Sequence, residues 1–204
     1  MTSLTGLIVE KMICRSALIR VHPALIKAIC HVLFQEGRNR RVKISELGEY
    51  FTTMSLAKGD LSEDGEECIL YGELFTTYGR VISHVKSKTE VVKGATRSRG
   101  VDLLFPSSTT VDAISLIAPS AITKEGVILG GDMFGIHIFP EYNNQYLSYL
   151  LYYCYRDLLA GYAQGSTIIH LHYNDIKNIQ VSVHDLPTQR KISHLLRLLE
   201  EEKE

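Results

Sequence analysis

Residues 160–192 read AGYAQGSTIIHLHYNDIKNIQVSVHDLPTQRKI and contain the strongest structural signals of the chain. Gly165, within Ala163-Gln164-Gly165-Ser166, is typical of a residue that ends a helix. Two short runs rich in β-branched residues follow at 167–171 and 179–183, on either side of the polar turn Asp175-Ile176-Lys177-Asn178. Leu186-Pro187 then favours a new helix, because proline is tolerated in a first helical turn. The stretch predicts a helix end, two short strands and a second helix.

A long helix is predicted immediately before this stretch, from an N-cap at Asn143 or Asn144 to about Tyr162. Its apolar residues share one face: Leu147, Leu150, Leu151, Cys154 and Leu158. A neighbouring stripe consists of tyrosines: Tyr142, Tyr146, Tyr149 and Tyr153. We expect most of these tyrosines to lie in the core or at its flank.

The first 41 residues are predicted to form an N-terminal helical segment. Pro23 fits a helix start, and the apolar face that follows comprises Leu25, Ile29, Val32 and Leu33. A basic connector comes next, with Arg38, Arg40, Arg41 and Lys43. The helix either packs on the core of the following domain, which is the simpler interpretation, or forms a cap or partner-binding appendage.

Short β-like runs separated by glycine, serine and charged residues fill the region from residue 42 onward. They lie at 42–44, 67–74, 81–85, 102–105, 113–117 and 127–139, and Gly130-Gly131-Asp132 interrupts the last run. Strands of such uneven length predict an α+β domain, with a mixed, curled β-sheet and packed helices, over residues 42–187. Residues 188–204 are predicted to form a C-terminal helix with apolar residues at roughly heptad spacing.

The order of these motifs resembles a target recognition domain in the specificity (S) subunits of type I restriction-modification enzymes. The family pattern combines Ala-Gln-Gly-Ser, a strand, Asp-x-Lys-Asn, a second strand and Leu-Pro before a helix with Gln and Lys, here Gln189 and Lys191. Weaker counterparts precede it: Leu47-Gly48-Glu49-Tyr50-Phe51, Lys58-Gly59-Asp60, Tyr71-Gly72-Glu73-Leu74, Leu103-Leu104-Phe105-Pro106-Ser107-Ser108 and Leu129-Gly130-Gly131-Asp132-Met133. The resemblance covers about residues 42–200.

This resemblance implies a non-catalytic protein whose domain at 42–187 reads one half of a split DNA target. It implies that 188–204 is the start of a conserved spacer helix, a truncated coiled-coil arm that docks methyltransferase (M) subunits through Ile192, Leu195, Leu196 and Leu199. Motor-nuclease (R) subunits would join through the complex, and a second copy of the chain could pair through the same helix. S-adenosylmethionine, Mg and ATP would belong to these partners, so this chain would hold no cofactor or metal. The short helix fits a truncated piece or a natural half-subunit.

Charge is distributed unevenly along a chain of formal net charge -1 at pH 7. Every ionisable residue at 59–73 is acidic, whereas the run 80–99 is mostly basic, so one face could be basic. A duplex reader places cationic groups and hydroxyls on phosphates. We therefore expect phosphate contacts from Lys86, Lys88, Lys93, Arg97 and Arg99, and secondarily from Ser107, Ser108 and Thr109. Both runs are equally consistent with ordinary solvated surface.

Gln164, Gly165 and Ser166 are the candidates for reading bases. Glutamine can pair bidentately with adenine, and glycine permits close approach of the backbone. Arg97 or Arg99 could instead read guanine. The alternative for Gln164-Gly165-Ser166 is a helix C-cap followed by a hydroxyl at the start of a strand.

Composition and motifs disfavour several other classes of protein. The chain has 204 residues, 45% of them hydrophobic, which is enough for one substantial core. Its four cysteines are far apart and its N-terminus lacks a signal-peptide pattern, so we expect a cytoplasmic protein without a disulfide framework. It has no apolar run long enough for a membrane and no G-x-S-x-G, G-x-x-x-x-G-K-[ST] or H-E-x-x-H motif. The Asn/Asp-Pro-Pro-aromatic loop expected of an adenine methyltransferase is also missing.

Three other functions stay open at this stage. The chain could bind a methyltransferase without reading DNA, or serve as the recognition module of a combined restriction-methylation enzyme. It could also be a small-molecule enzyme built around His137, His170 and His172. The last two share one face of a predicted strand and could take two positions of a metal site, although hydrogen-bonded strand histidines are the simpler interpretation.

Overall fold

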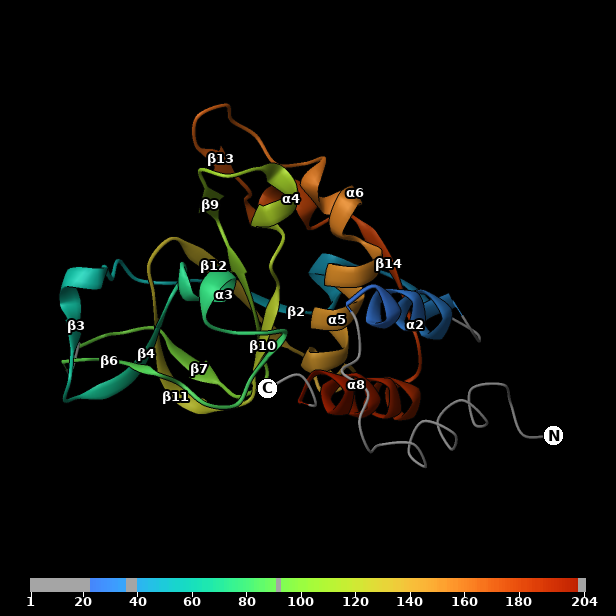
Figure 1. The fold of residues 1–204 in the computed structure, drawn as a ribbon, viewed down its shortest axis with the longest axis horizontal. Coiled ribbons are helices and arrows are strands. Elements are labelled where there is room, and N and C mark those ends of the chain that lie inside the picture. Colours follow the sequence, from blue (N-terminus) through green and yellow to red (C-terminus); the bar gives the residue numbers. More distant parts are fainter. Residues whose placement is uncertain (1–22, 36–39, 91–92, 202–204) are drawn as a thin grey trace.

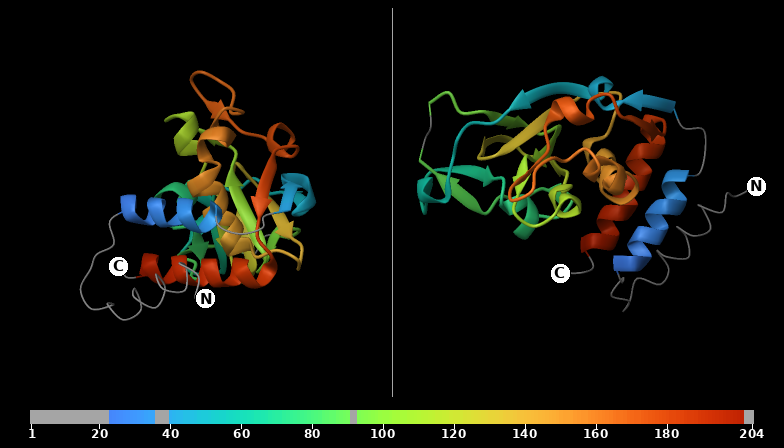
Figure 2. Two further views of the ribbon diagram at one scale, coloured as in Figure 1. Left: turned by 90° about the vertical axis from the view of Figure 1, so that its right-hand side faces the viewer. Right: turned by 90° about the horizontal axis from the view of Figure 1, so that it is seen from above.

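The computed structural model describes residues 23–35, 40–90 and 93–201. Three helices, α2 (Pro23–Gln35), α5 (Asn144–Cys154) and α8 (Leu186–Glu201), lie on one side of the molecule, and two β-sheets lie on the other (Figure 1). Seen from above, α2 and α8 run side by side (Figure 2). The predicted α+β class is confirmed.

The strands form two five-stranded mixed sheets rather than one curled sheet. The first has the order β2 (Gly48–Thr52), β12 (Met133–Ile138), β8 (Asp102–Pro106), β10 (Ser120–Ile122) and β5 (Val81–Ile82). The second has the order β3 (Leu61–Ser62), β6 (Ser87–Thr89), β4 (Glu66–Leu70), β11 (Glu125–Gly130) and β7 (Arg97–Arg99). Within each sheet one pair is parallel, β10 with β5 and β4 with β11, and the other pairs are antiparallel.

Smaller elements connect the sheets and the helices. Two short strand pairs are β1 (Arg40–Lys43) with β14 (Gln180–Val183) and β9 (Ser108–Thr109) with β13 (Ile169–His170). The short helices are α3 (Glu73–Thr76), α4 (Ala113–Leu116), α6 (Arg156–Ala160) and α7 (Tyr173–Ile176), with 3-10 turns η1 (Ile44–Glu46) and η2 (Lys58–Asp60). Among the described helices, none combines the length and apolar character that crossing a membrane requires.

The N-terminal helix α2 packs into the main core together with α5, α8 and the first sheet. Its buried residues are Ile26, Cys30, Leu33 and Phe34. Of the predicted face, Leu33 is buried and Ile29 packs against this core, whereas Val32 is 44% exposed. Both sets of residues have the same helical spacing, so only packing against α5 distinguishes them. Residues 1–22 and Arg38 lie outside the described residues.

The predicted long helix is interrupted at Tyr155 and forms α5 and α6. The Tyr155 backbone, at φ −118° and ψ 2°, is not helical, and its hydroxyl accepts a hydrogen bond from the Ser182 N–H of β14 at 2.7 Å. Leu158, beyond the break, is 48% exposed instead of continuing the apolar face. Tyr146 and Tyr149 are fully buried, as expected for tyrosines of the core.

Residues 113–117, predicted as a strand, contain helix α4. Asp112 caps this helix, because its carboxylate accepts hydrogen bonds from the Ser115 N–H at 2.7 Å and the Ser115 hydroxyl at 2.8 Å. A short apolar run has no periodicity that separates helix from strand. The local cap therefore decides the structure, and in the same way Leu74, predicted in a strand, lies in α3 after β4 has ended at Leu70.

The helix predicted after Leu186-Pro187 is α8, and the side chain of a buried glutamine holds its first turn in place by hydrogen bonds. The Gln189 side chain is 1% exposed. It accepts a hydrogen bond from the Asn143 N–H at 2.8 Å and donates one to the His184 carbonyl at 2.7 Å. Gln189 therefore ties the first turn of α8 to the N-terminus of α5.

Candidate nucleic-acid interface

An exposed hairpin contains the residues predicted to read bases. Gln164 and His170 exchange backbone hydrogen bonds of 2.8 and 2.7 Å, and the residues between them are largely exposed at the top of the molecule (Figure 1). Gly165 has φ +120°, and a Cβ on it would lie 2.0 Å from the Ile168 carbonyl oxygen. The turn therefore requires glycine. The helix-cap alternative is wrong, because α6 ends at Ala160.

Strand β13 joins this hairpin to the predicted serine contacts. His170 and Ile169 pair with Ser108 and Thr109 of β9, and the Leu171 N–H donates to the Ser107 carbonyl at 2.9 Å. The fold thus brings together two predicted groups that lie far apart in the sequence. Their accessibility differs, since Gln164 and Ser166 are exposed whereas Ser107 and Ser108 are each 8% exposed.

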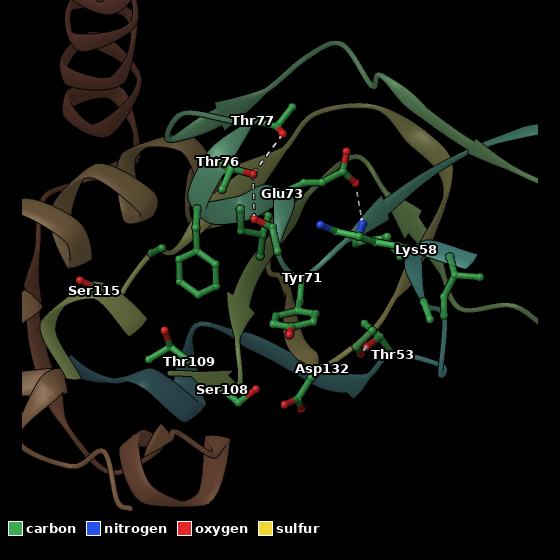
Figure 3. Close-up of a pocket in the computed structure, with 18 of the residues that line it drawn as sticks. Thr53, Lys58, Tyr71, Glu73, Thr76, Thr77, Ser108, Thr109, Ser115 and Asp132 are labelled. Atoms are coloured by element: carbon green, nitrogen blue, oxygen red, sulfur yellow. Dashed lines mark hydrogen bonds between the residues drawn. The ribbon is translucent and has the colours of Figure 1, made fainter. Parts of the chain in front are cut away.

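A large cleft opens beside the hairpin, with a volume of about 1670 Å³. Its lining comes from the loop 53–61, α3, β9 and the junction of α5 with α6, and it includes Ile168 at the hairpin tip. Hydroxyl side chains are common in it, and the labelled ones surround the cavity (Figure 3): Thr53, Tyr71, Thr76, Thr77, Ser108, Thr109 and Ser115. Such a surface offers many hydrogen-bond donors and acceptors with little net charge.

The acidic groups of the cleft differ in availability. Glu73 is engaged within the protein, because its carboxylate accepts hydrogen bonds from the Leu70 N–H at 2.8 Å and the Ser87 hydroxyl at 2.6 Å. Asp132 lies at the opposite wall and is exposed (Figure 3). The basic lining residues are Lys58, Arg80 and Arg156.

Two of these cations, Arg80 and Arg156, are functional candidates that the sequence does not single out. Arg156 follows Tyr152 by four residues, and this spacing is the one signal that could have paired them. Arg80 is separated from both in the sequence, so only the fold brings it to the cleft.

Of the predicted phosphate-contacting run 86–99, Ser87 lines the cleft but none of the basic residues does. Arg97 on β7 forms an ion pair with Glu66 and donates to the Gly126 carbonyl at 3.0 Å. Arg99 pairs with Glu49 at 3.4 Å. The acidic and basic runs therefore share one sheet, in which Glu66 of β4 partly neutralises Arg97 of β7 across β11, instead of forming one basic face.

The three lysines of that run are exposed. Lys88 lies on β6 directly opposite Glu67 of β4, while Lys86 and Lys93 flank the strand. The structure brings neither these lysines nor the β7 arginines together with the Gln164 hairpin.

The apolar residues predicted to dock partner subunits are buried in the chain's own core. Ile192, Leu195, Leu196 and Leu199 are 6, 8, 0 and 6% exposed, respectively. The outward face of α8 instead presents Arg190, Lys191, His194 and Leu198. Partner binding through the buried four stays a prediction, and it would require α8 to separate from the core.

The three histidines considered as the centre of a small-molecule enzyme do not form one site. His137 is hydrogen-bonded through Nδ1 to Asp102 and stacks on Phe51 at 4.1 Å, whereas His170 and His172 stack on each other with centroids 6.0 Å apart. None of the three lines the cleft. In the described ranges, no three His, Cys, Asp or Glu side chains are grouped to hold a metal ion.

Two of the described thiols, Cys68 and Cys154, lack the properties of nucleophiles. Burial raises the pKa of Cys154 to about 11, and burial together with the charge of Glu73 raises that of Cys68 to about 11. Both thiols stay protonated at neutral pH, and the thiolate is the reactive form.

Comparisons with solved structures identify the fold. The chain is similar to a chain from a structure of the type I R-M system described for its complex assembly and conformational transition, with 14% identity and a TM-score of 0.62 over 88% of this chain and 44% of that one. The HsdS subunit from Thermoanaerobacter tengcongensis is 14% identical, with a TM-score of 0.59 over 88% of this chain and 43% of that one. The S subunit of a type I restriction-modification system from M. genitalium is 12% identical, with a TM-score of 0.57 over 82% of this chain and 40% of that one. This chain thus spans less than half the length of these proteins.

Comparison by sequence gives the family. Among curated proteins, none matches the chain. The family model described as "Type I restriction modification DNA specificity domain" matches residues 39–204, which is most of the chain and includes the hairpin, the cleft and α8. The chain therefore belongs to the family of type I restriction-modification DNA specificity domains.

Proposed function

We propose that this chain reads one half of a bipartite DNA target as the specificity subunit, or half-subunit, of a type I restriction-modification complex, and catalyses no reaction itself. The observation that carries the proposal is the exposed Gln164 hairpin, which Gly165 shapes and β9 holds at the edge of a hydroxyl-lined cleft. Major-groove readers need polar side chains that project from a rigid support. The family and the solved relatives, of which the chain spans less than half, support a single recognition domain.

In this proposal Gln164 and Ser166 contact base edges, and Gly165 lets the backbone approach them. The hydroxyls of Ser108 and Thr109 at the cleft wall contact DNA phosphates, with Ser107 contributing through the backbone that supports them. Lys86, Lys88 and Lys93 are outer phosphate contacts. Arg97 and Arg99 would join them only where DNA displaces their acidic partners, which costs part of the binding energy.

The partners follow from the family. We propose that M subunits bind this chain through α8 and that R subunits join through the complex, while a second copy of the chain could supply the other half-site. S-adenosylmethionine, Mg and ATP would be held by those subunits. The exposed face of α8, with Arg190, Lys191 and His194, is the surface available for docking without unfolding the core.

Selection from a random duplex library tests the DNA-reading function. The purified chain should enrich a short, fixed sequence, and Gln164→Ala should relax one base pair of it, where a bidentate contact is worth about 1–3 kcal/mol. Gln180→Ala, an exposed glutamine on β14, is the matched control and should leave the selected sequence unchanged. No enrichment by the wild-type chain, alone or with M subunits, would refute the proposal.

A further inference from the structure

Two guanidinium groups lie against one tyrosine ring in the wall of the cleft. The Cζ atoms of Arg80 and Arg156 lie 4.2 and 4.5 Å from the centroid of the Tyr152 ring. All three residues, which we call the arginine stack, line the cleft. Two like charges close together repel each other, and an anion that binds beside them offsets this repulsion by its attraction to both.

Arg80 is a buried cation without a close carboxylate. It is 8% exposed, and its Nη1 donates to the Pro119 carbonyl at 2.5 Å. Burial lowers the pKa of Arg80, and the charge of Glu200 acts in the opposite sense. Among the described ion pairs, which extend to 4 Å, none includes Arg80. Because an arginine stays protonated at neutral pH, its charge is only partly compensated by carbonyl, ring and distant acid.

Arg156 is half-buried and has donors to spare. Its Nε donates to the Ile114 carbonyl at 2.9 Å, and its Nη1 donates to the Tyr152 hydroxyl at 3.3 Å. A guanidinium has five N–H donors, so three have no partner among the described residues. Asp112 already uses both carboxylate oxygens to accept hydrogen bonds from Ser115, and these bonds lower its pKa.

The surroundings of the stack suit a phosphate. Thr76, Thr77 and Ser115 (Figure 3) line the same cleft as the arginine stack. The Ser115 hydroxyl donates to Asp112 and the Thr76 hydroxyl to the Gly72 carbonyl, so Arg156 is the main donor that this wall offers to phosphate oxygens. The same cleft is also lined by Thr109 and by Ile168 at the tip of the hairpin. A polymer held at the hairpin can therefore reach the stack along one surface.

We propose that Arg156, oriented by Tyr152 and reinforced by the fixed charge of Arg80, binds a backbone phosphate of the DNA that the hairpin reads. This inference rests on the proposed function and adds a specific anchor to it. Arg156 is the contacting residue, because its free donors and partial exposure allow direct bonds. Arg80 and Tyr152 are positioning residues, because they act on the phosphate through Arg156 and through their electrostatic potential.

The salt dependence of DNA binding tests this anchor. Arg156→Ala should weaken binding to the selected duplex by about ten-fold and should reduce the slope of log affinity against log salt by about 0.9, the value for one phosphate contact. Arg41→Ala, which removes an exposed arginine from β1, should change neither quantity. An unchanged salt slope in Arg156→Ala would overturn the inference, whatever happens to affinity.

Arg156→Lys separates a phosphate contact from a purely structural role. Lysine keeps the charge but loses the planar fork, so it should restore the slope and only part of the affinity. If Arg156 merely held α6 against Ile114, Ala and Lys would lower the melting temperature alike and leave the slope at the wild-type value. Inorganic phosphate is the probe for a free-anion site: thermal stabilisation of wild type by phosphate, with an unchanged DNA slope in Arg156→Ala, would also overturn the inference.

The two proposals fail differently in these experiments. A wild-type chain that binds DNA without sequence preference, yet loses slope in Arg156→Ala, would refute the proposed function and support the anchor. A wild-type chain that selects a sequence, with no slope change in the variant, would refute only the anchor. Absence of any DNA binding by the wild-type chain, with or without M subunits, would refute both.

Discussion

The hairpin around Gly165 and helix α8 come from the same short stretch of sequence, yet they are opposite kinds of structure. The hairpin exposes Gln164, Ser166 and Ile168 and is defined by backbone hydrogen bonds and one glycine. Helix α8 buries its apolar face, Leu196 included, in the main core. Side chains in the hairpin can therefore change at little cost in folding energy, whereas those of α8 cannot.

This difference separates recognition from support. The regularly spaced apolar residues of α8 look like a partner surface in the sequence. In the structure they are buried in the contacts of α8 with α2 and α5. Polar residues of the hairpin look like a helix end, but they form an exposed turn beside the cleft. Availability after folding, rather than residue type, distinguishes a surface that can bind from one that holds the protein together.

The largest expected effect is on stability, at Leu196. This residue is fully buried, so Leu196→Ala should lower the free energy of unfolding by about 2–5 kcal/mol in urea titrations. Leu198→Ala, at a site that is 39% exposed, is the matched control and should cost much less. Equal, small losses in both variants would mean that α8 is only loosely attached, and its apolar face would then be free for a partner.

Gly165→Val should have the next largest effect, on DNA binding instead of stability. The new Cβ would collide with the Ile168 carbonyl at a φ that valine avoids, so the hairpin must deform. We expect the affinity for the specific duplex to fall by about a hundred-fold, which corresponds to the loss of roughly two base contacts. The melting temperature should change little. Gly59→Ala, where a Cβ meets nothing within 4 Å, should bind normally. A folded Gly165→Val protein with wild-type selectivity would remove the hairpin from the interface.

The smallest effect is expected for Arg97→Ala combined with Arg99→Ala. Both side chains are exposed, like the hairpin, but both have acidic partners, and exposed ion pairs contribute little to stability. We expect the salt slope of DNA binding to fall by less than about 0.9, one phosphate contact. A fall of about 1.8 would show that both arginines leave their partners and contact DNA, which would extend the interface to β7.

Elements marked by clear periodicity, proline or glycine could be predicted from sequence, whereas those decided by a single side-chain interaction could not. Helices α2 and α8, strand β14 and the turn between β11 and β12 follow from periodicity, proline and glycine. The Asp112 cap of α4 and the Tyr155 hydroxyl bond that ends α5 are single interactions. Each outweighs a weak local preference, and the second depends on a residue that is distant in the chain.

The candidate site was predictable in its parts but not in its assembly. Gln164 and Ser108 were identified by residue type, yet only the pairing of β13 with β9 shows that they lie together. Arg80 lies in a basic run that suggests surface, whereas the fold buries it against Tyr152. The acidic partners of Arg97 and Arg99 come from other strands, and a charge count along the sequence cannot show such pairing.

The pairing of β1 with β14 brings together the two ends of the segment 44–179, which contains both sheets and the hairpin. Beyond this pair, the Ile44 N–H donates to the Ile179 carbonyl at 3.0 Å and the Ser45 N–H to the Lys177 carbonyl at 2.9 Å. A segment whose ends meet in this way can be exchanged as a cassette with little disturbance to its flanks. A graft of residues 44–179 from a relative would transfer a new target preference onto the same α2 and α8, provided that it kept the face of α5 on which both helices rest.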